Sequence, residues 1–238
     1  MIENIEGIIK WIKEYVQETK SKGVVVGNSG GKDSATVIAL CVKALGKENV
    51  LAVEMPCYST QEELEDGLLI ARTYDVKNVV IDIKNMYENL KETIENSGIR
   101  LNNDSKANTK PRLRMTTLYA IAQTYNYLVV GTGNLCEKFV GYTTKWGDNA
   151  SDFNPIANFT VEEVLEIGKA LGVPEKILNK APNDGLGGGT DEEKLGVSYK
   201  EITEYIKTGT TNEEAIKKIE ELHEKTNHKR NPIPTYKP

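Results

Sequence analysis

The chain has 238 residues, of which 30 are basic and 35 acidic, giving a formal net charge of −5. The two signs are interspersed, so no basic stripe is available to neutralise a nucleic-acid backbone, and the length fits one α/β domain with a helical appendage. We therefore expect no nucleic-acid partner and no second catalytic domain.

The cysteines and the apolar runs indicate the compartment. Cys41, Cys57 and Cys136 are widely spaced and form no C-x-x-C pair, which argues against a disulfide framework or a zinc site. The charged N-terminal segment 1–20 is unlike a signal peptide, and the longest apolar run, 35–42, is too short to cross a bilayer. These features predict a cytoplasmic protein with reduced thiols and no membrane partner.

Strand and helix signals alternate through the first part of the chain. After an amphipathic helix at 1–20, each short β-branched apolar run is followed by a helical pattern, which predicts an α/β fold with a doubly wound parallel sheet. Such sheets bind ligands at the carboxyl ends of their strands. We expect strands at 23–28, 49–55, 78–83 and 127–131, and helices at 33–45, 61–74, 84–96 and 111–125.

From Asn154 onward the strand signals fade. Helical patterns at 160–171, 198–207 and 212–224 predict a helical C-terminal appendage, so we divide the chain into a sheet core at about 1–153 and an appendage at about 154–238. The segment 182–191 holds four glycines in ten residues. It is either a flexible linker or a lid that closes over a nucleotide, and the sequence does not choose between them.

A glycine-rich segment follows the first expected strand. It reads GNSGGKDS and comprises Gly27, Asn28, Ser29, Gly30, Gly31, Lys32, Asp33 and Ser34. Glycines allow backbone N–H groups to approach an anion, the following helix adds its positive N-terminal end, and the serines add hydroxyl donors. A plain N-capped helix start is the alternative interpretation. The segment predicts a site for a nucleotide phosphate.

This segment differs from the nucleoside-triphosphatase loop. That loop needs G-x-x-x-x-G-K-[ST], but here Val26 takes the place of the first glycine and Asp33 that of the hydroxyl residue. The part from Ser29 to Ser34 instead resembles the SGGxDS loop of the N-type ATP pyrophosphatases, which cleave ATP to AMP and pyrophosphate. An acidic residue inside an anion site indicates a cation, so Asp33 is a candidate Mg²⁺ ligand.

Two further segments carry candidate site residues. Lys110, Arg112 and Arg114 cluster near the start of the helix expected at 111–125, where the helix dipole does not favour cations. They form either a solvated basic turn or a set of side chains that face phosphates.

The second segment, 131–155, follows the last expected strand. Thr132 and Glu137 would lie together at the edge of the sheet, and Glu137 is a candidate second carboxylate for the cation at Asp33. An ordinary surface loop is the alternative. Further on, charged side chains lie among aromatic residues and glycines: Lys145, Asp148 and Asp152.

The order of these segments resembles that in the NAD⁺ synthetases, N-type ATP pyrophosphatases that amidate deamido-NAD⁺. GNSGGKDS, NTKPRLRMTTLYA, GTGNLCE, GYTTKWGDNASDFNPI and NHKR occur in the family's order from about residue 24 to residue 230. GMP synthetase and the tRNA thiolases share only the SGGxDS loop. The resemblance implies a single synthetase domain over 1–238 with an adenine nucleotide alpha hydrolase-like, Rossmann-like fold.

The resemblance also implies a ligase reaction in two steps, with ATP as co-substrate and Mg²⁺ as cofactor. The nicotinate carboxylate attacks the α-phosphorus of ATP and releases pyrophosphate, and ammonia then displaces AMP from the acyl adenylate. Such chemistry needs positioning and charge stabilisation but no side-chain nucleophile.

The motif match assigns roles to individual residues. Asp33 and Glu137 would hold Mg²⁺, and the catalytic residues would be Asp33 and Asp148, the latter by steering or deprotonating ammonia. The residues implied for ATP are Gly27, Asn28, Ser29, Gly30, Gly31, Lys32, Asp33, Ser34, Thr132 and Asn183. The residues implied for deamido-NAD⁺ are Arg112, Tyr119, Lys145, Asp152, His228 and Lys229.

The chain departs from the family pattern at positions linked to ATP. Many relatives carry a lysine where this chain has Val161 and a serine or threonine where it has Asn183, and the segment 184–189 is richer in glycine here. Family members that use glutamine have an additional N-terminal domain, whereas this chain reaches its phosphate loop by residue 27, so we expect free ammonia as the donor unless a separate glutaminase subunit delivers it. The family also implies a homodimer.

Other function classes stay open at this point. A tRNA sulfur-transfer enzyme would need catalytic cysteines and a basic surface, and a GMP-synthetase-like enzyme would share the phosphate loop alone. A non-catalytic nucleotide-binding module would bind ATP without turnover and would not need the full set of Asp33, Glu137, Asp148 and Lys145. Pyrophosphate release with deamido-NAD⁺, xanthosine monophosphate or tRNA distinguishes these classes.

Overall fold

The sheet of the computed structural model, which describes residues 2–180 and 190–237, has four parallel strands. They are β1 (Gly23–Gly27), β2 (Val50–Glu54), β3 (Lys77–Val80) and β4 (Tyr127–Val130), in the order β3-β2-β1-β4. Residues of β1 pair with both neighbours, as Val25 does with Leu51 and Val129. The β-branched run predicted this, because strands buried on both faces are apolar throughout.

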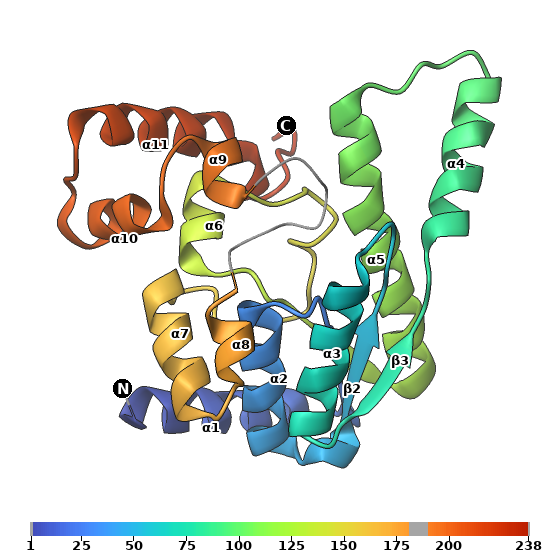
Figure 1. Cartoon of the computed structure of the whole chain (residues 1–238), viewed down its shortest axis with the longest axis vertical. Helices are drawn as coiled ribbons and strands as arrows, with labels where there is room; N and C mark the ends of the chain where they lie inside the picture. Colours follow the sequence, from blue (N-terminus) through green and yellow to red (C-terminus); the bar gives the residue numbers. More distant parts are fainter. Residues whose placement is uncertain (1, 181–189, 238) are drawn as a thin grey trace.

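Helices cover both faces of the sheet (Figure 1). Val24 and Val26 pack against one layer and Val25 against the other, because successive strand residues point to opposite faces. The first layer contains α1 (Ile2–Glu18), α2 (Lys32–Leu45), α3 (Gln61–Thr73), α7 (Val161–Ala170) and α8 (Glu175–Leu178). The second contains α4 (Lys84–Asn96) and α5 (Asn103–Tyr125).

A third hydrophobic cluster lies outside these layers. It joins α6 (Leu135–Val140) with α9 (Asp191–Leu195), α10 (Tyr199–Thr208) and α11 (Glu213–Lys225), which Figure 1 shows to one side of the sheet. Fully buried members include Cys136, Ile202 and Ile219. The helical appendage therefore has its own core, although α7 and α8 pack on α2 in the first layer and α6 belongs to the appendage. The division of the chain near residue 153 stays a prediction.

The position of the site follows from the strand order. The chain moves outward from β1 through β2 to β3 and then returns to place β4 on the other side of β1. Ligand sites in open parallel sheets lie at such reversals, beyond the carboxyl ends of the two strands. Both the GNSGGKDS segment and Thr132 follow these strand ends.

The prediction for α5 was wrong by eight residues at its start. The helix begins at Asn103, where the side chain of Asn102 accepts a hydrogen bond from the N–H of Ser105, and Pro111 lies inside the helix instead of at its first position. Lys110, Arg112 and Arg114 are therefore in mid-helix and do not oppose the dipole at a helix start.

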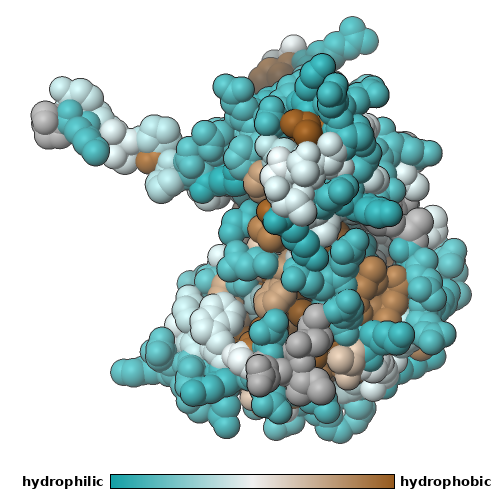
Figure 2. Space-filling model, turned by 90° about the vertical axis from the view of Figure 1, so that its left-hand side faces the viewer, coloured by the Kyte–Doolittle hydropathy of each residue, from teal (hydrophilic) through white to brown (hydrophobic). Residues whose placement is uncertain are grey.

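Hydrophilic side chains cover most of the face shown in Figure 2, and apolar residues gather in its hollowed middle. None of the helices within 2–180 and 190–237 is long and apolar enough to span a membrane. The three cysteines of the chain are buried and free.

Candidate active site

A cavity of about 480 Å³ opens beyond the carboxyl ends of β1 and β4. This volume lies in the range of small-molecule sites. Its lining combines the loop after β1, the loop after β4 and one side of α5. Of the residues implied for ATP, metal and catalysis, those that line it are Gly27, Asn28, Ser29, Gly31, Lys32, Asp33, Ser34, Thr132, Glu137 and Asp148.

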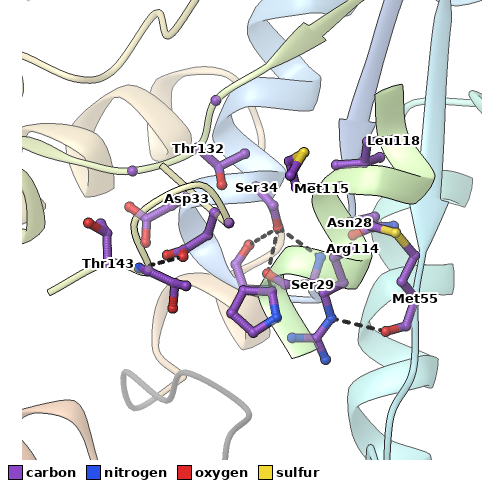
Figure 3. A pocket seen from close by; sticks show the side chains of 18 of the residues that line it. Asn28, Ser29, Asp33, Ser34, Met55, Arg114, Met115, Leu118, Thr132 and Thr143 are labelled. Carbon is purple, nitrogen blue, oxygen red and sulfur yellow. Dashed lines mark hydrogen bonds between the residues drawn. The ribbon is translucent and has the colours of Figure 1, made fainter. Parts of the chain in front are cut away.

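The GNSGGKDS segment forms a compact loop at the start of α2. The hydroxyls of Ser29 and Ser34 are 3.0 Å apart, and the N–H of Gly31 donates to Ser29 Oγ at 3.3 Å (Figure 3). The N-cap of α2 is Gly31, and no side chain caps it. Asp33 lies in the first turn, so the plain N-capped start is not what forms here. The first N–H groups of α2 remain available to an anion, as a phosphate site requires.

Gly30 supports this loop from behind and does not belong to the described lining of the cavity. Its φ is +74°, and a Cβ at this position would lie 2.7 Å from the carbonyl oxygen of Glu63. Asn28 fixes the same contact, because its side chain donates to the carbonyl oxygen of Gly67 at 2.9 Å and accepts from the N–H of Gly30 at 3.3 Å. The loop therefore rests directly on α3.

The acidic end of the cavity is built around Asn134, the N-cap of α6. Its N–H donates to Glu137 Oε2 at 2.9 Å in a capping box, and its side-chain amide donates to Asp33 Oδ1 at 3.5 Å. Burial raises the pKa of Asp33 despite the neighbouring Lys32, and burial together with the charge of Asp33 raises the pKa of Glu137 well above its ordinary value. Two desolvated carboxylates of like charge are stabilised as anions by a shared cation.

This pair of carboxylates fits Mg²⁺. The ion is usually held by one or two carboxylates together with substrate phosphates rather than by an all-protein cage. The described part of the chain offers no group of three or more His, Cys, Asp or Glu side chains that could hold a metal ion. Asp33 and Glu137 beside a phosphate loop match the arrangement that needs substrate oxygens to complete it.

The opposite wall of the cavity is apolar. Figure 3 shows Met55, Met115 and Leu118 on one side of the serine hydroxyls, and Asp33 with Thr132 on the other. Arg114 also lines this wall, where its Nε donates to the carbonyl oxygen of Met55 at 3.1 Å. A cavity with an apolar end, a phosphate loop and an acidic end suits a nucleotide whose base, phosphates and metal occupy successive positions.

A loop after α6 closes the acidic end. The N–H of Thr144 donates to Asp148 Oδ1 at 2.7 Å, and Lys229 Nζ donates to the carbonyl oxygens of Gly141 and Thr143 at 2.7 and 2.5 Å. Asp148 is exposed as a residue, but desolvation of its carboxyl raises the pKa of that group. Desolvation lowers the pKa of Lys229. Lys229 lines the cavity, but its described contacts hold this loop in place.

The other residues implied for deamido-NAD⁺ lie outside the described lining. They form two contacting pairs: Arg112 Nε donates to the carbonyl oxygen of Lys145 at 3.3 Å, and the Tyr119 hydroxyl donates to Asp152 Oδ1 at 3.3 Å. Desolvation and the charge of Asp152 raise the pKa of Tyr119 to about 12. His228 is exposed, and Asn183 lies outside the described residues.

Asp152 also has a role within the fold. Its Oδ2 accepts a hydrogen bond from the N–H of Val129 at 2.7 Å, at the outer edge of β4. The carboxylate is thereby fixed against the sheet while its other oxygen faces Tyr119. A group held in this way can orient a neighbouring hydroxyl without itself moving.

Sequence reasoning missed several lining residues. Met55, Met115 and Leu118 are ordinary apolar residues in sequence. Met55 reaches the cavity because it follows the end of β2, and Met115 and Leu118 reach it from the middle of α5. Asp191 begins α9 after the capping residue Thr190, and the Tyr142 hydroxyl donates to it at 3.3 Å. The T-D-E-E pattern predicts a helix start at this point but not its approach to the site.

The sequence profile of the NAD synthase family matches residues 4–233. The chain belongs to the NAD synthase family. An NH(3)-dependent NAD(+) synthetase from Carboxydothermus hydrogenoformans is 42% identical over 96% of this chain and 94% of its own length. Among solved structures, an NMN synthetase from Francisella tularensis has a TM-score of 0.93 and 35% identity, covering 98% of this chain and 97% of its own. An NH3-dependent NAD synthetase from Campylobacter jejuni has a TM-score of 0.81 and 30% identity, covering 99% and 98%.

Val161 departs from the residue that the family resemblance predicts. The resemblance predicts a lysine at this position, but here the valine side chain is 6% exposed and packs in the core of the appendage. It contacts buried apolar residues rather than the described cavity.

Proposed function

We propose that this chain is a ligase that forms a C–N bond by amidating deamido-NAD⁺ to NAD⁺ with ATP and free ammonia. The observation that carries the proposal is the cavity itself, in which an uncapped glycine-rich loop, two crowded carboxylates and an apolar wall meet at the strand reversal. Membership of the NAD synthase family and likeness to enzymes named for ammonia-dependent NAD⁺ synthesis give the same chemistry.

In the first step the nicotinate carboxylate attacks the α-phosphorus of ATP, and pyrophosphate leaves. The hydroxyls of Ser29 and Ser34 and the free N–H groups at the start of α2 bind the departing phosphates. Lys32, which is buried and lines the cavity, adds positive charge where negative charge collects on pyrophosphate. The adenine ring occupies the apolar wall at Met55, Met115 and Leu118.

Asp33 and Glu137 would hold Mg²⁺. When bound, the ion neutralises phosphate oxygens and the two carboxylates together. The chain's own contribution is orientation: the capping box on Asn134 fixes Glu137, and the amide of the same residue contacts Asp33. Both carboxylates are therefore preorganised at the same end of the cavity.

In the second step ammonia attacks the acyl carbon of the adenylate, and AMP leaves with one oxygen of the original carboxylate. The attacking nitrogen loses a proton to become the amide. Asp148 is the proposed acceptor or orienting group, because its carboxyl lines the cavity and desolvation raises its pKa toward the range of a general base. The N–H of Thr144 orients it.

The remaining part of the dinucleotide lies outside the described cavity. We propose that it contacts the pairs formed by Arg112 with Lys145 and by Tyr119 with Asp152, and that His228 and Lys229 contact it from the C-terminal side.

We also propose a homodimer. Of the 23 residues of α5, Pro111 and Ala122 are the buried ones, so most of this helix is open to contact with a second copy of the chain. Light scattering tests the oligomeric state. The free, buried cysteines agree with a cytoplasmic location.

A second candidate substrate is nicotinate mononucleotide. The solved structure with the TM-score of 0.93 is of an enzyme named NMN synthetase. The reacting carboxylate, ATP and ammonia are the same for both substrates, and only the AMP half of the dinucleotide differs. The pairs at Arg112 and Tyr119 would contact deamido-NAD⁺ but not nicotinate mononucleotide, which lacks the AMP half.

Steady-state assays with ATP, Mg²⁺ and ammonium test both proposals. We expect pyrophosphate release to require a nicotinate substrate and to be absent with xanthosine monophosphate or tRNA. A kcat/KM at least tenfold higher for deamido-NAD⁺ than for nicotinate mononucleotide supports the main proposal, and the reverse ratio supports the second candidate. Release that needs no nicotinate substrate contradicts both.

A further inference from the structure

A buried carboxylate behind the phosphate loop holds two lysines. Asp66 of α3 is fully buried, and its two oxygens lie 2.6 Å from Lys176 Nζ and 2.7 Å from Lys180 Nζ. Burial acts to raise the pKa of Asp66, but the two lysines outweigh this effect and hold that pKa below its ordinary value. The carboxylate is therefore an anion that fixes both ammonium groups.

This ion-pair cluster touches the phosphate loop. A Cβ added to Gly30 would lie 3.1 Å from Cβ of Asp66 and 3.2 Å from the backbone nitrogen of Gly67. Asp66 thus packs directly against the backbone of the loop. Of the two lysines that it holds, Lys180 is among the described residues that line the cavity and Lys176 is not.

The two lysines of the cluster differ in their acidic neighbours. One carboxylate faces two ammonium groups, and Lys176 has a second acidic neighbour in Glu62 at 3.7 Å. Lys180 Nζ carries three N–H donors, of which one is directed at Asp66 in the described chain. A partly buried lysine at a cavity wall with donors to spare is suited to bind an anion there.

We propose that Lys180 contacts the pyrophosphate end of ATP and that Asp66 is the positioning residue that holds it beside the loop. This proposal rests on the proposed function for its substrate. Lys180 reaches the phosphates from just beyond the C-terminal end of α8.

The test compares Lys180→Met with Lys176→Met in the full-length chain. Both changes remove one of the two lysines on Asp66, and only the first removes a residue of the cavity lining. We expect Lys180→Met to raise the KM for ATP and the Kd for inorganic pyrophosphate at least about tenfold, the scale of one charge-assisted hydrogen bond, with the KM for the nicotinate substrate within twofold. Lys176→Met should leave all three within twofold.

Two further variants separate contact from fold. Lys180→Arg keeps the charge and should recover most of the affinity for pyrophosphate, and Asp66→Asn should weaken pyrophosphate binding while the chain stays folded by circular dichroism. Equal effects of Lys180→Met and Lys176→Met on pyrophosphate binding would overturn the proposal. Calorimetry with pyrophosphate needs no turnover, so it tests Lys180 even if the chain proves not to amidate a nicotinate substrate.

Discussion

Replacing Gly30 with alanine perturbs the phosphate loop in two ways at once. A residue with a Cβ at φ +74° costs roughly 1–2 kcal/mol in the left-handed region. The new Cβ would also lie 2.7 Å from the carbonyl oxygen of Glu63, and this overpacking against backbone costs a further 1–3 kcal/mol or so. We expect the free energy of unfolding to fall by about 2–5 kcal/mol, a large part of the roughly 5–15 kcal/mol that holds a domain together.

Two other glycines separate these contributions. Gly98 has φ +90° and nothing within 4 Å of an added Cβ, so Gly98→Ala measures the backbone cost alone. Gly31 has φ −100°, and an added Cβ would meet a side-chain atom, the hydroxyl oxygen of Ser29, at 3.3 Å rather than backbone. We expect a loss of about 1–2 kcal/mol for Gly98→Ala and a change within about 1 kcal/mol for Gly31→Ala.

The assay is urea unfolding followed by circular dichroism, without nucleotide, for the wild type and the three variants. The difference between Gly30→Ala and Gly98→Ala gives the cost of the contact between the loop and α3. If Gly30→Ala loses no more stability than Gly98→Ala, the loop does not rest on α3, and the reasoning about Gly30 is refuted.

Three further predictions concern other parts of the molecule. Asp33→Asn should reduce pyrophosphate release at least about a hundredfold while the chain stays folded by circular dichroism, with the exposed Asp104→Asn as the control; unchanged turnover would remove Asp33 from the metal site. The pKa of Asp66 is lower in the folded chain than its ordinary 3.8, so this carboxylate contributes stability that is present above about pH 3.8 and lost as the pH falls through the folded pKa. The free energy of unfolding, measured with urea, should therefore fall less for Asp66→Asn than for the wild type between pH 5 and pH 2, roughly the interval of this titration. Parallel pH curves for the two proteins would argue against the ion-pair cluster. Burial raises the pKa of the Cys41 thiol to about 12, and all three cysteines are buried, so a thiol reagent should label none of them in the native chain and all three in denaturant; rapid labelling of the native chain would contradict this.

The sequence predicted the sheet and the glycine-rich loop after β1 because their signals are local. A β-branched run, a glycine-rich turn and an apolar helix in succession specify a strand, a tight loop and a helix without reference to the rest of the chain. The prediction that Thr132 and Glu137 lie together followed from one rule, the common edge of parallel strand ends, and both line the cavity.

Other features depend on tertiary contacts and were missed or misplaced. The start of α5 was predicted at Pro111, whereas the side chain of Asn102 caps the helix and its first residue, Asn103, lies eight positions before Pro111. Lys180 resembles any surface lysine in sequence, since the carboxylate that holds it is 114 positions away. Arg112 and Tyr119 were assigned by resemblance, and the structure places them beside the cavity rather than in it.

The most direct test of the central claim uses deamido-NAD⁺ with ¹⁸O in its nicotinate carboxylate. If the carboxylate attacks the α-phosphorus of ATP and ammonia then displaces AMP, mass spectrometry should find one ¹⁸O in the phosphate of AMP and none in pyrophosphate. AMP without label would contradict the account, because the carboxylate would not then have been adenylated.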